Sequence, residues 1–278
     1  MSIEILPAHY AVFSDAHSNL EALDAVLGDI DKRRIPKIFC LGDIIGYGAN
    51  PKECLRLTIQ RCQESTIRGN HDEAAFFKQA YKKYNSLNPT AVEAIEWTDK
   101  VIGIGKESED LWKFIETLPY SIINNGAGFF HGSPVIGEYL EGYVFSAPLS
   151  QDEESVRKWR ARTEFVFSNV SNIAFIGGTH IPVIFTQTRG RIEVISPVAE
   201  QEYRIGTGKS IINVGSVGQP RDGDRRACYV EINSRDGVIR NNSVIFRRVE
   251  YDVNAACQKI LDAKGLDSTL GYRLLSGR

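Results

Sequence analysis

The stretch YAVFSDAHSNL at residues 10–20 decides the fold class of this chain. Residues 11–14 form an apolar run that predicts a β-strand, and Asp15 and His17 follow it directly. Ser18 then opens an amphipathic helical pattern that begins like a capping box. The apolar positions of this helix are Leu20, Leu23, Val26, Leu27 and Ile30. A strand that leads at once into a helix predicts an α/β protein.

Four more short apolar runs end in polar groups in the same way. They predict strands over residues 37–41, 65–68, 128–130 and 173–176. The groups that follow them are Gly42-Asp43, Gly69-Asn70-His71-Asp72, His131-Gly132 and Gly177-Gly178-Thr179-His180. A helix is predicted over Pro51–Cys62, with proline in its first turn. Ligands bind outside the carboxyl ends of strands in open α/β sheets, so we expect these side chains to converge.

Histidine is scarce in this chain, which makes its placement informative. Four of the five histidines lie in these motifs, and only His9 lies outside them, where we expect a surface or strand-edge position. Taken alone, Asp15 could be a turn residue or a helix cap, and Asn70 a left-handed turn residue. The concentration of histidines at strand ends favours a shared binding site over these separate explanations.

The candidate ligands combine carboxylate, imidazole and amide groups without a thiolate. They are Asp15, His17, Asp43, Asn70, His131 and His180. This mixture suits Mn, Fe, Zn or Ni and does not choose among them. Six side chains are too many for one tetrahedral zinc, but they match two divalent cations that share a bridging carboxylate. Such a pair activates water and neutralises phosphate oxygens during in-line attack, so we expect hydrolysis of a phosphate ester.

His71 is left outside this ligand set. It follows Asn70 directly, and the ordinary pKa of histidine near neutrality makes it a candidate general acid for the leaving oxygen. Asp72, its neighbour, is a candidate catalytic partner that favours the protonated imidazole. Bound metals would act in the opposite direction, and the sequence leaves that balance open.

In their order and content, these motifs resemble those of the calcineurin-like metallophosphoesterases. The family pattern D-x-H, G-D, G-N-H-D/E, a histidine and G-H-x-H runs over residues 15–180. Residues 213–221, which read NVGSVGQPR, resemble a late segment of the bacterial phosphodiesterase-like subgroup. The resemblance implies a four-layer α/β/β/α sandwich of two mixed β-sheets flanked by helices.

The resemblance also implies roles for individual residues. Asp15, His17 and His180 would bind the first cation, Asp43 would bridge, and Asn70 and His131 would bind the second. Mn is the metal expected first, with Fe, Zn or Ni as alternatives. The residues implied to contact substrate are Asn70, His71 and Arg221. For Arg221, a solvated turn position is the competing interpretation.

The chain departs from the family pattern at two places. Gly178 stands where the family has the first histidine of G-H-x-H, so the second cation loses a ligand and we expect weaker binding there. Residues 42–48 read GDIIGYG, whereas protein phosphatases read G-D-x-V-D-R-G. The chain lacks that aspartate and that arginine, so a protein phosphatase is disfavoured.

Composition limits the remaining possibilities. The 278 residues contain 33 Lys+Arg and 35 Asp+Glu, a net charge of −2 that argues against a nucleic-acid binder. Five cysteines without a C-x-x-C pair indicate neither a disulfide framework nor a cysteine zinc site. We expect a soluble, cytoplasmic protein without a signal peptide or membrane span, because no basic start or long apolar run is present. No feature indicates an oligomeric state.

The rest of the chain predicts one domain over residues 1–278. Residues 73–119 predict helices, which either bury aromatics against a sheet or partly cap the site. Residues 137–143 are glycine-punctuated and fit either a substrate lip or a plain surface loop. The segment after His180 predicts antiparallel hairpins of the second sheet. The tail at 263–278 shows little pattern and is expected to be loosely held.

The expected function is a metal-dependent phosphoesterase, most simply a phosphodiesterase or nucleotide hydrolase with a small phosphoester or nucleotide as substrate. One alternative from another class is a binding scaffold that has lost turnover, which Gly178 suggests. Retention of Asp15, Asn70 and His71 speaks against it, because a scaffold needs no general acid. A phosphomonoesterase or protein phosphatase is the alternative within the enzymes.

Overall fold

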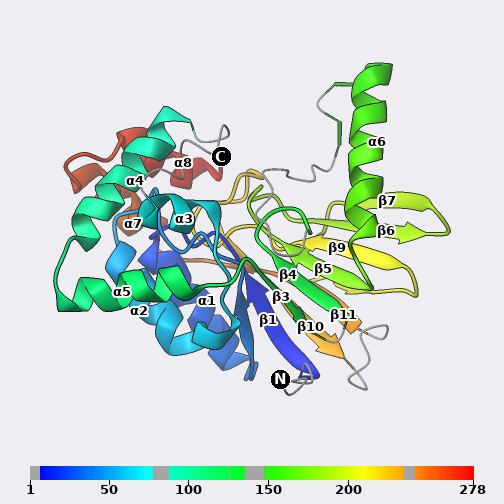
Figure 1. The fold of residues 1–278 in the computed structure, drawn as a ribbon, viewed down its shortest axis with the longest axis horizontal. Helices are drawn as coiled ribbons and strands as arrows, with labels where there is room; N and C mark the ends of the chain where they lie inside the picture. Colours follow the sequence, from blue (N-terminus) through cyan, green and yellow to red (C-terminus); the bar gives the residue numbers. More distant parts are fainter. Residues whose placement is uncertain (1–6, 78–87, 125, 135–146, 149, 235–241) are drawn as a thin grey trace.

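The computed structural model describes residues 7–77, 88–124, 126–134, 147–148, 150–234 and 242–278. Within them, two mixed β-sheets pack face to face and helices cover both outer faces (Figure 1). This is the predicted four-layer α/β/β/α sandwich. The predicted lip at residues 137–143 lies outside the described residues.

The first sheet has the strand order β2-β1-β10-β11-β8. β1 and β2 are parallel, and the other neighbours are antiparallel. The strands span His9–Phe13 (β1), Ile38–Cys40 (β2), Glu202–Arg204 (β8), Ala227–Ser234 (β10) and Asn242–Val249 (β11). The two parallel strands therefore bring the loops that begin at Ser14 and Leu41 to the same edge.

The second sheet has the order β3-β4-β5-β9-β6-β7, with β4, β5 and β9 parallel. Its strands span Ser121–Asn124 (β3), Ala127–Phe130 (β4), Ile173–Ile176 (β5), Val183–Thr188 (β6), Arg191–Ile195 (β7) and Lys209–Asn213 (β9). The loops after β4 and β5 begin with His131 and Gly177, so this sheet also presents site residues at its carboxyl end.

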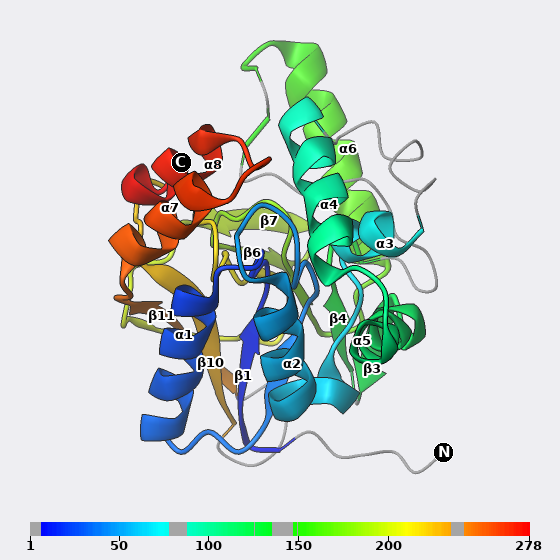
Figure 2. The same cartoon turned by 90° about the vertical axis from the view of Figure 1, so that its left-hand side faces the viewer.

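The described residues form eight α-helices, which lie mostly on the side of the first sheet, as Figure 2 shows. They span Leu20–Lys32 (α1), Pro51–Cys62 (α2), Asn70–Phe76 (α3), Pro89–Ile102 (α4), Lys106–Thr117 (α5), Glu153–Ser168 (α6), Val253–Asp262 (α7) and Ser268–Ser276 (α8). A single turn of 3-10 helix covers Gln63–Ser65. Among the helices of the described residues, α6 alone covers the second sheet (Figure 1).

Alternation along β1 shows how the layers are built. Ala11 and Phe13 pack in the core beneath the helices, whereas Tyr10 and Val12 pack in the core between the sheets. Successive side chains of a strand point to opposite faces, so an apolar strand joins two cores at once. A third core lies between the second sheet and α6, and includes Phe167.

Two local predictions about the first loops were wrong. The cap of α1 is Asn19, whose side chain accepts a hydrogen bond from the Ala22 amide at 3.2 Å. Ser18 instead belongs to the loop, where its amide donates to the Ile44 carbonyl. The strand predicted at 65–68 is reduced to one bridge between Thr66 and Cys40, because Arg68 already pairs with Pro119 outside the sheet.

We expected the strands after His180 to form the second sheet, but only some of them do. β6, β7 and β9 do, whereas β8, β10 and β11 belong to the first sheet, where β10 pairs with β1. Apolar alternation predicts that a segment is a strand, but both sheets need the same alternation. The apolar alternation therefore does not indicate which of the two sheets a strand joins.

The expectation of a loosely held tail was also wrong. Residues 268–276 form α8, capped by the Asp267 side chain, and Leu270 and Leu274 are buried in a cluster with α4 and α7. The helix is short and Gly271 interrupts its pattern, which is why the sequence signal is weak.

The helical segment 73–119 is confirmed for α3, α4 and α5. Phe114 is buried beneath the first sheet, and Phe76 and Trp112 pack against the same core, so these aromatics serve the helical layer. Tyr81 and Tyr84 lie outside the described residues. The capping role stays a prediction.

Candidate metal centre

The six predicted ligands converge where the carboxyl ends of the two sheets meet. Asp15 and His17 follow β1, Asp43 follows β2, His131 follows β4 and His180 follows β5. Asn70 opens α3. All six side chains are buried. The convergence that the sequence predicts is therefore present in the structure.

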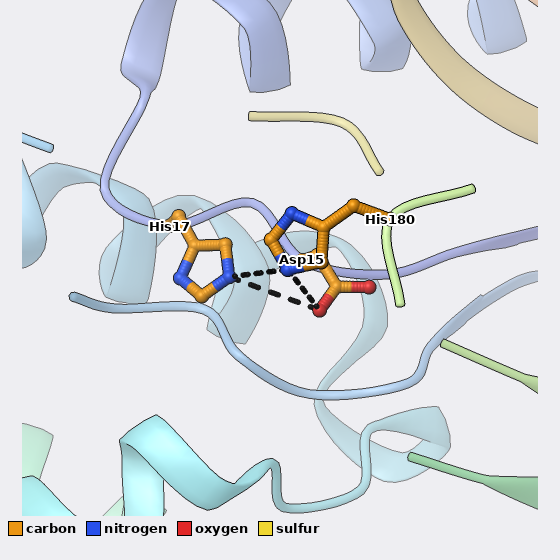
Figure 3. Close-up of side chains that lie close together, drawn as sticks. All are labelled: Asp15, His17 and His180. Atoms are coloured by element: carbon orange, nitrogen blue, oxygen red, sulfur yellow. Dashed lines mark hydrogen bonds and ion pairs between the residues drawn. The ribbon is translucent and has the colours of Figure 1, made fainter. Parts of the chain in front are cut away.

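We call Asp15, His17 and His180 the first half of the centre (Figure 3). Their facing atoms are close: His17 Nε2 lies 3.2 Å from His180 Nε2 and 3.8 Å from Asp15 Oδ1. His180 Nε2 lies 3.4 Å from the same Asp15 oxygen. Two imidazole nitrogens and one carboxylate oxygen thus surround one point.

Asp43, Asn70 and His131 form the second half. His131 Nε2 lies 3.3 Å from Asp43 Oδ2 and 3.1 Å from Asn70 Oδ1. Asp43 Oδ2 also lies 3.5 Å from His17 Nε2 in the first half. One carboxylate oxygen therefore faces both halves, as a bridging ligand must.

Backbone carbonyls fix the orientation of the three imidazoles. His17 Nδ1 lies 3.2 Å from the Ile45 carbonyl, His131 Nδ1 2.7 Å from that of Leu41, and His180 Nδ1 2.6 Å from that of Gln219. A carbonyl only accepts, so each Nδ1 carries a proton and each Nε2 points to the centre, where it offers a lone pair whenever it is not itself protonated. This is the tautomer that a metal-binding histidine needs.

Two buried oxygens fit a cation between these residues. Asp15 Oδ1 has no hydrogen-bond partner although it is buried. The Asn70 amide faces His131 Nε2 and both Asp43 oxygens, so its nitrogen can donate to them without a cation and its oxygen can turn toward a cation. Oxygens and lone pairs that converge in this way are unfavourable without a positive charge among them. The donor set suits borderline to hard divalent ions.

Burial and mutual charge set the protonation of the metal-free site. Burial lowers the pKa of His17 and His180 well below the usual value, so both imidazoles are neutral. Burial raises the pKa of Asp15 to about 6. Burial also opposes charge on His131, but the Asp43 carboxylate outweighs it and raises the pKa of His131 to about 10. In the metal-free protein, the His131 proton thus supplies positive charge between the two halves.

The backbone of the site loops is unusual. Asp15, His17, Asp43 and His180 all adopt positive φ, between 47° and 61°. Non-glycine residues take this conformation at a cost of roughly 1 kcal/mol or more each, so the surrounding packing must hold it. At Gly69, an added Cβ would lie 2.1 Å from Asp43 Oδ1, so only glycine fits beside this ligand.

Asp72 lies beneath the loop that carries Asp43. Its two oxygens accept hydrogen bonds from the amides of Gly69, Asp43, Ile44 and Ile45, at 2.8–3.2 Å. Both oxygens are thus occupied by the backbone. These contacts give Asp72 a positioning task, in contrast to the expected influence on the imidazole of His71.

His71 is buried beside the first half, although we expected it at the mouth of the site. Its amide donates to Asp43 Oδ1 at 2.8 Å, and its ring centroid lies 4.8 Å from that of His17. Nδ1 has no partner among the described residues. Burial lowers the pKa of His71 to about 4, although the Asp43 charge opposes this, so the imidazole is neutral.

The late segment at 213–221 supports the first half. Ser216 donates to the Asp15 carbonyl at 2.9 Å, and the Gln219 carbonyl holds His180. Arg221 follows, with its guanidinium near the centre, where its charge also lowers the pKa of His17, His71 and His180. The sequence singled out this segment through resemblance alone, and its contacts supply the physical reason.

Gly178 leaves the second half with one imidazole. Its amide donates to Asp15 Oδ2 at 3.0 Å, so it contributes backbone to the first half and no side chain to the second. Sequence reasoning missed Tyr47, whose ring lies 4.7 Å from the His17 ring and 4.5 Å from the His71 ring. Its only signal was its position four residues after Asp43.

A two-sheet sandwich with this centre at the carboxyl ends of its strands defines the class of metallophosphoesterases. Residues 9–235 match the calcineurin-like phosphoesterase superfamily domain, and the chain belongs to that superfamily. The chain is 39% identical over 272 residues to an uncharacterised protein of Methanocaldococcus jannaschii, with 96% of this chain and 98% of the relative covered.

Solved structures agree with this assignment. A metallophosphoesterase from Sphaerobacter thermophilus is similar with a TM-score of 0.76 and 30% identity, over 97% of this chain and 99% of that one. A hypothetical protein from Pyrococcus horikoshii has the same fold, with a TM-score of 0.70 and 18% identity over 97% and 98% of the chains. None of the helices in the described part of the chain combines the length and apolar character of a membrane span.

Proposed function

We propose that this protein hydrolyses small phosphodiesters or nucleotides with two divalent cations, of which Mn is the first candidate and Fe, Zn and Ni are alternatives. One observation carries the proposal: three Nε2 atoms converge with carboxylate and amide oxygens, while each Nδ1 is fixed by a carbonyl. When bound, the cations supply an activated water and neutralise phosphate oxygens. A small soluble substrate is proposed, without nucleic acid or membrane.

The chain's own residues then divide the work. Asp15, His17 and His180 hold one cation, Asn70 and His131 hold the other, and Asp43 lies between them. His71 stands beside the bridging carboxylate, and its Nδ1 has no partner among the described residues, so we assign it the contact to the phosphate. The negative charge of a bound phosphate favours the protonated imidazole, which then supplies the proton for the leaving oxygen. Asp72 keeps the loop of Asp43 in place.

The second half binds its cation more weakly in this proposal. Asp43, Asn70 and His131 supply one imidazole, one amide and a shared carboxylate, and the glycine at 178 adds nothing. Water or substrate would complete that coordination. Occupancy of the second half then depends on the concentration of free metal.

Metal counting combined with a chromogenic diester tests the proposal. Metal-free protein is titrated with Mn, bound metal is counted by plasma mass spectrometry, and release of p-nitrophenol from bis-(p-nitrophenyl) phosphate is followed on the same samples. We expect hydrolysis that requires metal, is lost in Asp43→Asn and falls strongly in His71→Ala. His9→Ala is the matched control, because His9 lies outside the centre and pairs with Glu231 at 2.9 Å.

Full rate in both Asp43→Asn and His71→Ala would contradict the proposal. A panel of monoesters, diesters and nucleotides then separates the substrate classes. Preference for monoesters would favour a phosphomonoesterase. A protein phosphatase is disfavoured by Tyr47, which occupies the loop where those enzymes carry the clamping arginine.

A binding scaffold without turnover is the second candidate, and Gly178 is the observation that favours it. Protein that binds no metal and hydrolyses nothing at high Mn would support it. Protein that binds one cation tightly and hydrolyses diesters would exclude it.

A further inference from the structure

Tyr47 lies close both to the metal centre and to two arginines. Its ring contacts the rings of His17 and His71. The guanidinium carbons of Arg221 and Arg273 each lie 5.9 Å from the centroid of the same ring. Arg221 comes from the loop after β9, and Arg273 from α8. Two positive charges from distant parts of the chain are thus gathered beside the centre.

Neither guanidinium forms an ion pair with a carboxylate side chain among the described residues. Arg221 donates to the neutral Gln219 side chain at 2.8 Å, and its Nε is buried without a partner. Arg273 donates to a main-chain oxygen of Arg278, the last residue of the sequence, at 3.3 Å. The nearby carboxylates are taken elsewhere: Asp222 pairs with Arg248, and Asp224 with Arg226.

The fold holds the two arginines in a fixed relation. Leu270 and Leu274 anchor α8 in the cluster that also contains Tyr47. The end of α8 is joined to the other arginine's loop, because the Gly223 amide donates to the Gly277 carbonyl at 2.9 Å. The Arg221 amide itself donates to the His180 carbonyl at 3.3 Å. Arg221, Arg273 and the first half of the centre are therefore one connected unit.

Two neighbouring guanidiniums repel each other, and an anion between them removes that cost. Burial, followed by the charge of Arg221, lowers the pKa of Arg273. Guanidinium groups match phosphate oxygens in geometry as well as charge. The unpaired Nε of Arg221 gives such an anion a buried donor.

We propose that Arg221 and Arg273 bind a second phosphate group of the substrate, next to the phosphate that is hydrolysed at the metal centre. This inference rests on the proposed function and narrows its substrate class. The substrate is an ester that also contains a phosphoanhydride, such as a nucleoside polyphosphate ester. A simple monophosphate ester would bind at the metal centre without a second phosphate for the two arginines.

Two p-nitrophenyl esters that differ only in phosphate number test this. They are the p-nitrophenyl esters of thymidine 5′-monophosphate and of thymidine 5′-triphosphate. In both, water adds to the phosphorus that bears p-nitrophenol, the bond from that phosphorus to the phenol oxygen breaks, and the water proton is released as p-nitrophenolate departs. The measured quantity is the ratio of kcat/KM for the triphosphate ester to that for the monophosphate ester.

Wild type should prefer the triphosphate ester, and Arg273→Gln should lower the ratio about tenfold, mainly through KM, as expected for loss of one charge-assisted contact. Arg273→Lys should keep most of the ratio, because it keeps the charge. Arg157→Gln, an exposed change of the same charge on α6, is the control and should alter neither ester. Arg221→Gln should lower the ratio as Arg273→Gln does.

The outcomes separate this inference from the proposed function. Hydrolysis of neither ester by metal-loaded wild type overturns the proposed function and the inference with it. Hydrolysis of both esters with an equal ratio in wild type and Arg273→Gln overturns only the inference. In that case the two arginines serve to pack Tyr47 against α8.

Discussion

The two halves of the metal centre are built alike but are not equally complete. Each has an imidazole held by a carbonyl, and each faces the same Asp43 oxygen. The first half has two imidazoles and its own carboxylate, whereas the second has one imidazole and an amide. The comparison teaches that the backbone and most side chains of a site can be in place while one side chain that the family pattern predicts is missing.

The largest effect is expected from the residue that both halves share. Asp43→Ala removes the bridging oxygen and leaves His131 without its charge partner, so both metals should weaken. We expect hydrolysis to fall by about 10³-fold, corresponding to several kcal/mol of charge stabilisation. Metal content and diester hydrolysis measure this. Asp110→Ala, an exposed carboxylate on α5, is the control, and an unchanged metal content in Asp43→Ala would contradict the bridging role.

Removing one histidine from each half separates the halves. His180→Ala should weaken the tighter cation by about 100-fold or more, because loss of a partner that only orients a ligand already costs about 10–100-fold. His131→Ala should leave that tighter site nearly unchanged and abolish the weaker one. Calorimetric titration with Mn resolves the two affinities. Equal losses in both variants would mean that the halves do not bind independently.

Restoring a ligand in the second half is the converse experiment. Gly178→His should raise the affinity for the weaker cation by about 10–100-fold. The residue has φ of +73°, so any side chain here carries strain of roughly 1 kcal/mol. Gly178→Ala bears that strain without the imidazole and is the matched control. A gain in both variants, or in neither, would show that position 178 does not face the second cation.

Asp72 tests whether the loop of Asp43 needs its buried support. In Asp72→Asn the amide nitrogen cannot accept, so two of the four backbone amides lose their acceptor. Each such loss costs about 1–3 kcal/mol, so we expect stability to fall by about 2–6 kcal/mol. Denaturation in urea measures this. The weaker cation should lose more affinity than the tighter one; a variant as stable as wild type would refute the positioning task.

The smallest effect is expected far from either half. Arg56 on α2 and Glu107 on α5 form an exposed ion pair. Solvent screens such pairs, so Glu107→Ala should change stability by no more than about 0.5 kcal/mol and leave metal binding unchanged. The same urea denaturation supplies the reference against which the Asp72 variant is judged.

Much of the fold and the ligand set could be predicted because the signals are local. A window of about ten residues is enough to recognise the short apolar run followed by Asp15 and His17. The amphipathic helix that comes next is recognised from a window of similar length. The remaining candidate ligands follow the same pattern, in which a polar group comes directly after a short apolar run. Their convergence follows from the rule that parallel strands share a carboxyl edge, although here two sheets contribute to it.

The remaining features depend on contacts between distant residues. Nothing in the sequence near Asp72 says that its oxygens accept amides from the loop of Asp43, and nothing near His180 names Gln219 as the carbonyl that holds it. The pairing of β10 with β1 and the docking of α8 beside Tyr47 are set by tertiary packing. Patterns of ten residues carry no information on such partners.

The pairing of β1 with β10 has a consequence for how the chain folds. All six candidate ligands precede residue 181, and the first two lie in the loop after β1. A hydrogen-bonded neighbour of β1 is β10, with His9 opposite Asn233. A nascent chain synthesised only as far as β9 would therefore contain every candidate ligand but still lack β10, the strand that pairs with β1 in the first sheet. Such long-range pairing slows folding, so productive metal capture should come late in biosynthesis.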